Sequence, residues 1–187
     1  MSARRLRASV VTYGATISAF AGGGDWRRAL GLLHEARSQH VEVNTIAYNA
    51  AIDACDKGFQ WTIALHLLDE MLATGVQPST ATFNSALHAC GECRRWQQSL
   101  VLLEEMGPAA VRRDIVSLNG AMAGLLRAQL WSEALAIVSE IPSFKLAPDG
   151  VTWTCLISAC GAGQKWRRAL NLYSRLQRHG KPGVILC

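Results

Sequence analysis

Apolar residues in this chain fall at helical spacing, in paired segments separated by short polar turns. One series consists of Tyr48, Ala51, Ile52 and Cys55, and the next consists of Ala64, Leu65, Leu68 and Met71. Because positions i, i+3, i+4 and i+7 share one face of an α-helix, each series predicts an amphipathic helix. Stop signals follow both series, at Lys57-Gly58 and at Gly75 with Pro78. The pattern therefore predicts a helical hairpin.

The hairpin pattern repeats with a period of 35 residues. The segment from Tyr48 to Cys55 returns as Phe83 to Cys90, and Asn119 continues the series begun by Asn49 and Asn84. Five of the six tryptophans follow the same period: Trp26, Trp61, Trp96, Trp131 and Trp166. The repeats accordingly span residues 10–44, 45–79, 80–114, 115–149 and 150–184.

A single hairpin of this size cannot bury both of its apolar faces, so successive hairpins must stack on one another. The predicted fold class is all-α, a right-handed α-solenoid of about five hairpins, with residues 10–187 forming one array. Each tryptophan opens a second helix, and we expect it to wedge between the two helices of its own hairpin as a core residue. Alanines three residues later, at 29, 64, 134 and 169, permit that close approach.

The opening of each repeat resembles the pentatricopeptide repeat family. Its units are 35 residues long and begin with a motif like Val-Thr-Tyr-Asn-Thr-Leu-Ile, which is similar to Val11-Thr12-Tyr13, Ala47-Tyr48-Asn49 and Val151-Thr152-Trp153 with the residues after them. The closing Gly-x-x-Pro of the family is similar to Gly75 to Pro78. Tetratricopeptide repeats have a period of 34 and a Trp-x-x-Leu-Gly-x-x-Tyr context that is absent here.

The resemblance implies single-stranded RNA binding, with one base read per repeat. The fifth residue of a repeat reads the base together with the last residue of the following loop. In this chain the implied pairs are Asn49 with Ser79, Asn84 with Asp114, and Asn119 with Asp149, flanked by Gly14 with Asn44 and by Thr154 with a residue near Gly183 or Val184. Gly14 has no side chain with which to read a base.

By the family's pattern, Asn with Ser implies C, Asn with Asp implies U, and Thr implies a purine, which gives a target core of C-U-U-purine. Second-position residues would flank the bases as apolar plates: Val11, Ile46, Ala81, Val116 and Val151. Lys57 and Arg127 are the expected phosphate contacts. The acidic residues Asp53 and Glu92 also lie on predicted first helices and offset this positive charge. The arginine pairs at 27–28, 94–95, 112–113 and 167–168 fall on second helices, turns or loops.

Composition adds little to this picture. The 187 residues include 19 Lys+Arg against 14 Asp+Glu, a net charge of +5, which permits an anionic partner without requiring one. Uncharged stretches are rich in Gly, Ser and Thr, so no membrane span is expected. Cys55, Cys90 and Cys160 share one repeat position and are expected to be small core residues. Cys90 and Cys93 have half of a zinc-site spacing without a second half. We expect no metal, no cofactor, no catalytic residue and no enzymatic activity.

Residues 1–9 form a basic segment with Arg4, Arg5 and Arg7 that resembles the end of an organellar transit peptide, and a ragged terminus is the simpler alternative. The resemblance implies a chloroplast or mitochondrial location. Two functions remain open. One is an organellar RNA-binding module for RNA processing, stability or translation. The other is a scaffold subunit of a larger organellar complex, either a ribosome or a membrane assembly, because an uncapped solenoid end such as Val184 to Cys187 invites a partner.

Overall fold

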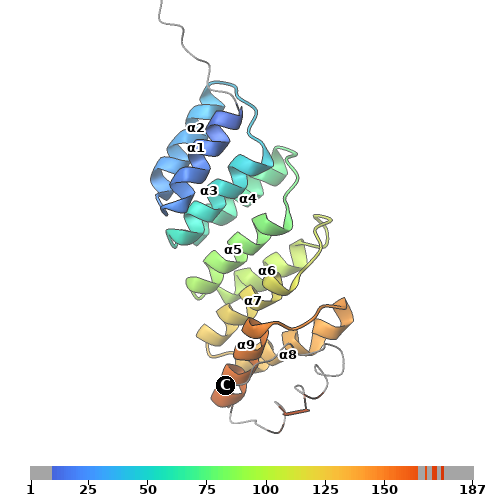
Figure 1. Ribbon diagram of the computed structural model, residues 1–187. Coiled ribbons are helices and arrows are strands. Elements are labelled where there is room, and N and C mark those ends of the chain that lie inside the picture. Colours follow the sequence, from blue (N-terminus) through green and yellow to red (C-terminus); the bar gives the residue numbers. More distant parts are fainter. Residues whose placement is uncertain (1–9, 164–166, 168–169, 172–173, 175–187) are drawn as a thin grey trace, which may run out of the picture. The chain divides into compact units, whose positions relative to one another are not determined.

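The structure is a computed structural model that describes residues 10–163, 167, 170–171 and 174. All regular structure in these residues is helical (Figure 1). The first helices of the repeats are α1 (Val10–Gly22), α3 (Thr45–Lys57), α5 (Thr80–Glu92), α7 (Ile115–Arg127) and α9 (Gly150–Gly163). The second helices are α2 (Trp26–Ser38), α4 (Trp61–Ala73), α6 (Trp96–Glu105) and α8 (Trp131–Glu140), and a 3₁₀ turn, η1 (Ile141–Phe144), follows α8.

The predicted all-α hairpin repeat is confirmed. First helices begin at residues 10, 45, 80, 115 and 150, and second helices begin at the tryptophans 26, 61, 96 and 131. The basic segment 1–9, Trp166, Ala169 and the loop with Gly183 and Val184 lie outside the described residues. No helix among the described residues is long and apolar enough to cross a membrane.

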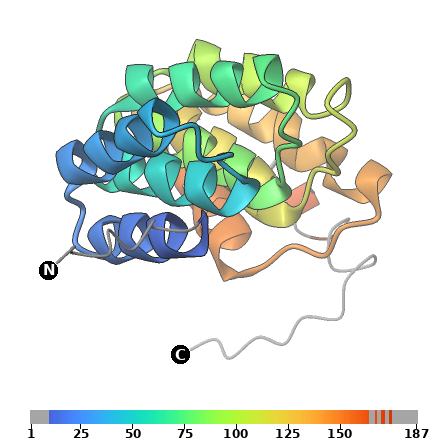
Figure 2. The same ribbon diagram turned by 90° about the horizontal axis from the view of Figure 1, so that it is seen from above.

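The chain divides into two compact units between Ala89 and Cys90, within α5. In the first unit α1 packs on α2 and α3, and α3 packs on α2 and α4, as the two views in Figures 1 and 2 show. In the second unit α7 packs on α6, α8 and α9, and α9 also contacts α8. The first helices α3 and α7 therefore each join their own second helix to the preceding hairpin, which is how a repeat buries a face that it cannot cover alone.

Large apolar side chains from both kinds of helix fill the space between hairpins. Fully buried examples in the first unit are Ile17, Leu33, Tyr48, Ile52, Leu68 and Met71, and in the second unit Met106, Leu118, Met122 and Leu125. Each fully buried side chain of this size contributes about 1.5–3 kcal/mol relative to an exposed one. Cys55, Cys90 and Cys160 are buried, as expected, and burial raises the pKa of the Cys55 thiol to about 12. That thiol is therefore neutral near pH 7.

Two of the tryptophans make a contact that the sequence did not predict. Trp26 is only half-buried, and its ring lies against Gly58, in the turn that follows α3 of the next repeat. Trp131 lies in the same way against Gly163, at the end of α9. The expected wedge between the two helices of the residue's own hairpin does not include this contact with the next repeat. For these two residues the ring joins successive repeats across a spacing of 32 residues.

The turn after α3 shows why a glycine is needed there. Gly58 has φ −86°, which any residue can adopt, and the left-handed conformation belongs to Phe59 at φ 55°. A Cβ on Gly58 would lie 2.3 Å from Cδ1 of Trp26, whereas real Cβ contacts lie beyond 3.0 Å. A glycine is therefore needed at position 58 to leave room for the tryptophan ring, and the backbone conformation of the turn does not require it. At the end of α4 the usual reason holds, since Gly75 itself has φ 76°.

We predict that Gly58→Ala destabilises the protein by about 1–3 kcal/mol, the usual cost of overpacking, because the new methyl group collides with the Trp26 ring. Gly31→Ala in α2 is the matched control, since no atom lies within 4 Å of its new Cβ. That substitution should be stabilising by about 0.5–1 kcal/mol, because Ala is the better helix former. Urea denaturation measures the change in unfolding free energy of each variant. Equal changes of the same sign in the two variants would contradict the packing role of Gly58.

Candidate nucleic-acid interface

The structure brings Asn49 and Ser79 together, as the sequence predicts. Asn49 lies on α3, and Ser79 is the residue before α5. The Asn49 Nδ2 donates to Ser79 Oγ at 3.1 Å, and a third residue, Thr82 on α5, donates its hydroxyl proton to Asn49 Oδ1. The backbone N–H of Ser79 donates to Thr82 Oγ1 at 2.9 Å, and the backbone N–H of Thr82 donates to Ser79 Oγ at 3.3 Å. Three side chains thus form one closed network.

The second unit holds the same arrangement with a carboxylate in it. Asn119 Nδ2 on α7 donates to Asp149 Oδ1 at 2.9 Å, and Thr152 Oγ1 on α9 donates to Asn119 Oδ1 at 2.8 Å. The backbone N–H of Thr152 donates to the same Asp149 oxygen at 2.8 Å. Asp149 therefore caps the N-terminus of α9 and holds the Asn119 amide at the same time.

The charge of Asp149 is stabilised by this network. Burial by itself raises the pKa of Asp149, but hydrogen bonds from the Thr152 backbone, the Asn119 amide, the Thr152 hydroxyl and the Val151 backbone outweigh it and bring the pKa below its ordinary value. Asp149 is consequently an ionised hydrogen-bond acceptor near neutral pH.

Thr82 and Thr152 were not among the predicted site residues, although the sequence holds a signal for them. A hydroxyl residue follows each position-five asparagine by 33 residues: Thr82 follows Asn49, Ser117 follows Asn84 and Thr152 follows Asn119. Ala47, in contrast, follows Gly14 at the same spacing. The hydroxyl is thus present where there is an asparagine amide to hold and absent where there is none.

The remaining predicted residues are placed as follows. Asn84 lies on α5 in the first unit, and Asp114 lies in the second unit, where its Oδ1 accepts from the backbone N–H and the hydroxyl of Ser117 at 2.8 Å each. Asn44 caps α3 through Ala47 N at 3.1 Å. Thr154 is exposed, and its hydroxyl donates to the Gly150 carbonyl of its own helix at 2.9 Å.

All five residues predicted to flank bases are exposed. Val11 is 77% exposed, Ile46 64%, Val116 53% and Val151 55%, and Ala81 is exposed as well. Exposed aliphatic side chains have no favourable contact with water. Each lies three residues before the reading position on its own first helix, and i and i+3 are neighbours on a helix surface. The placement is suitable for an apolar contact beside each reading residue.

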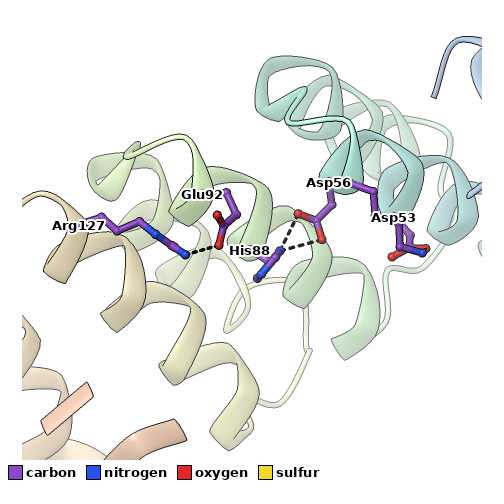
Figure 3. A network of polar contacts seen from close by, with 6 residues as sticks. Asp53, Asp56, His88, Glu92 and Arg127 are labelled. Atoms are coloured by element: carbon purple, nitrogen blue, oxygen red, sulfur yellow. Dashed lines mark hydrogen bonds and ion pairs between the residues drawn. The ribbon is translucent and has the colours of Figure 1, made fainter. Parts of the chain in front are cut away.

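The two predicted phosphate contacts are engaged with acidic residues. Lys57 Nζ lies 2.7 Å from Asp53 Oδ2 and 3.1 Å from the Ala21 carbonyl. In the second unit Arg127 pairs with Glu92 (Figure 3). Figure 3 also shows a pair that the sequence did not predict: in the first unit, Nδ1 of His88 on α5 contacts both carboxylate oxygens of Asp56 on α3 at 2.7 and 2.9 Å. The charges of the first helices are therefore largely balanced.

Comparison with known families agrees with the repeat geometry. A pentatricopeptide repeat domain model matches residues 1–58, a PPR repeat family model matches residues 43–92, and a PPR repeat model matches residues 81–107 and 151–180. Together these matches cover well over half of the sequence. The chain belongs to the pentatricopeptide repeat family. No match is found among curated proteins.

Solved structures of this family share the fold. The chain superposes on the PPR domain of Arabidopsis thaliana protein-only RNase P 1 in complex with tRNA with a TM-score of 0.75 at 16% identity, over 88% of this chain and 86% of that domain. It superposes on the pentatricopeptide repeat protein PPR10 from maize with a TM-score of 0.72 at 26% identity, over 96% of this chain and 26% of PPR10. The superposition on PPR10 in complex with an 18-nt psaJ RNA element has a TM-score of 0.73 at 24% identity, over 98% of this chain and 30% of PPR10. The chain therefore spans less than a third of the PPR10 chains.

We predict that Asp149→Asn lowers stability at pH 7 by up to about 1 kcal/mol, the contribution of a negative charge at a helix N-terminus. Because hydrogen bonds depress the folded-state pKa, the carboxylate stabilises the fold above its unfolded-state pKa of about 3.9, and this stabilisation is lost as the pH falls through the folded-state value. The difference between variant and wild type should therefore vanish near pH 2. Urea denaturation between pH 7 and pH 2 measures it, with Glu104→Gln on the exposed face of α6 as the control, and a constant difference would contradict the assignment.

Proposed function

We propose that the chain is a single-stranded RNA-binding module that reads about one base per repeat. The observation that carries this proposal is the pair of networks in which Asn49 with Ser79, and Asn119 with Asp149, are fixed side by side. Asparagine offers a donor and an acceptor, which suits a pyrimidine edge. The family resemblance supports the same reading, because relatives have been solved with tRNA and with an 18-nt RNA element.

The second residue of each pair supports a choice between C and U. Ser79 Oγ accepts hydrogen bonds from Asn49 Nδ2 and from the Thr82 backbone, so its two lone pairs are in use. Toward a base it can act only as a donor, with the proton that otherwise goes to Thr82 Oγ1 at 3.0 Å. Cytosine has an acceptor at N3. Asp149 is ionised and offers only acceptors, whereas uracil has a donor at N3. These two chemistries favour C at the second repeat and U at the fourth.

The proposed target core is C-U-U-purine, with the second pair reading C, the Asn84 and Asp114 pair and the fourth pair reading U, and Thr154 favouring a purine. Val11, Ile46, Ala81, Val116 and Val151 would flank the bases. The proposed location is organellar, in a chloroplast or mitochondrion, and the proposed role is RNA processing, stability or translation by binding, without catalysis.

Binding by this chain alone should be weak. Each base stacked on a protein side chain contributes about 1–3 kcal/mol, and the ordering of a flexible strand offsets part of that gain. Since Lys57 and Arg127 are paired with acids, the first helices also lack the concentration of positive charge that holds phosphates.

This balance of charge favours a second candidate function, a scaffold subunit of a larger organellar complex that binds protein. Size analysis of native extract separates the two functions. A scaffold subunit migrates as part of a large assembly with a fixed set of proteins, whereas migration as a free monomer contradicts the scaffold role.

We predict that the protein binds short single strands containing C-U-U-purine more tightly than scrambled strands of the same composition. Asp149→Ser should change the preference at the third base from U to C by about tenfold, equivalent to 1.4 kcal/mol, because serine replaces an acceptor by a donor while still capping α9. Ser79→Asp should make the opposite change at the first base. Fluorescence titrations measure both, and equal affinity for all strands would contradict base reading.

We predict that Glu92→Gln strengthens RNA binding at low salt, because Arg127 loses its anionic partner and presents its charge to a phosphate. The slope of log K against log salt should steepen by up to about 0.7, the value for one phosphate contact on a single strand. Glu104→Gln is the control for the change in net charge. A slope no steeper than that of the control would remove Arg127 from the phosphate contacts.

A further inference from the structure

Thr82 lies behind the pair that reads the first base. Its side chain is buried, with 0% exposure, and its hydroxyl contacts only residues of the reading network. It accepts from the Ser79 backbone N–H at 2.9 Å, donates to Asn49 Oδ1 and lies 3.0 Å from Ser79 Oγ. A buried residue cannot touch the base, so any influence of Thr82 on base choice passes through Ser79 and Asn49.

The structure orients the Asn49 amide with its oxygen toward Thr82 and its nitrogen toward Ser79. Asn49 Oδ1 can only accept, so the single hydroxyl proton of Thr82 goes to it. The Asn49 amide nitrogen then points to Ser79 Oγ at 3.1 Å, and the Thr82 backbone N–H approaches the same oxygen at 3.3 Å. With both lone pairs occupied, Ser79 can act toward a base only as a donor, and its proton has two possible acceptors, the base and Thr82 Oγ1 at 3.0 Å.

Removal of the Thr82 hydroxyl would change the orientation of the Asn49 amide and of the Ser79 hydroxyl. Asn49 Oδ1 would lose its donor, and a part-buried acceptor without a partner is costly. The nearest replacement is the Ser79 hydroxyl, which can donate to Asn49 Oδ1 once the amide turns round. Ser79 would then present a lone pair to the base and accept the N3 donor of uracil. We propose that Thr82 is a positioning residue that gives the second repeat its preference for C by keeping Ser79 a donor; this rests on the RNA-reading function proposed above.

The fourth repeat provides the internal contrast. Thr152 is equally buried, at 0% exposure, and makes the equivalent bonds to Asn119 and Asp149. Asp149 has no proton to redirect, because it is an ionised acceptor in either orientation of the amide. The hydroxyl of Thr152 therefore supports the network without deciding the base. The same substitution should alter base choice in one repeat and not in the other.

The test compares Thr82→Val with Thr82→Ser and with Thr152→Val, using strands that carry C or U at the first or the third base. Wild type should prefer C at the first base by about tenfold. Thr82→Val should bring that ratio to within about twofold, Thr82→Ser should retain it, and Thr152→Val should keep the preference for U at the third base. Retention of the C preference by Thr82→Val, or an equal loss of U preference by Thr152→Val, overturns the proposal.

A readout without RNA separates this proposal from the RNA-binding function. In the free protein, NMR should detect nuclear Overhauser effects from the Asn49 side-chain NH₂ to the Ser79 β-protons, and in Thr82→Val to the methyl groups introduced at position 82. Failure of wild type to bind any strand refutes the proposed function, whereas an unturned Asn49 amide in Thr82→Val refutes the role of Thr82. Thr82→Ala is the second variant if Thr82→Val does not fold, since Ala47 holds the equivalent position in the preceding repeat.

Discussion

Burial of apolar surface between successive hairpins is the interaction on which the rest of this structure depends. A two-helix unit leaves one face of its first helix uncovered, and α3 covers α1 and part of α2, as α9 covers α7 and part of α8. Trp26 and Trp131 extend the same contact to the turn of the next repeat, where Gly58 and Gly163 have no side chain in the way. The 35-residue period copies the spacing between hairpins within each unit.

That copied spacing is what brings the reading residues together. Asn49 and Ser79 are 30 residues apart, as are Asn119 and Asp149, and they meet because consecutive first helices lie side by side within each unit. Ser79 and Asp149, each the last residue of its loop, then have two tasks. Each caps the helix that follows, and each holds the amide of the asparagine on the preceding first helix. Local folding and the proposed base reading therefore rest on the same oxygen atoms.

Much of this arrangement could be predicted from the sequence, because a period of 35 residues constrains every repeat at once. The starts of the helices at Trp26, Trp61, Trp96 and Trp131 follow directly from it. The contact of Trp26 with Gly58 could not be predicted, because periodicity shows that a residue is apolar and leaves open which neighbour it meets. The end of α8 at Glu140 reflects Pro142, which cannot donate to a continuing helix.

The pairing of Lys57 with Asp53 is a four-residue spacing visible in the sequence, whereas that of Arg127 with Glu92 crosses 35 residues and depends on the stacking. The sequence places acidic residues on the first helices as well, but it does not show that each of these two basic residues is paired with one. Thr82 and Thr152 were missed for a similar reason, since a threonine in a first turn is ordinary until its distance from the asparagine is known.

The double task of the loop residue also restricts how the chain can change. Asn44, Ser79, Asp114 and Asp149 occupy the four capping positions, and all belong to the small set of residues that begin helices well. Exchange among Ser, Asn and Asp alters the hydrogen bond offered to a ligand while each helix keeps its cap. Under the proposed function, new base preferences are therefore accessible through single substitutions that leave folding nearly unchanged. Residues outside this set are disfavoured at these positions because they cap the following helix poorly.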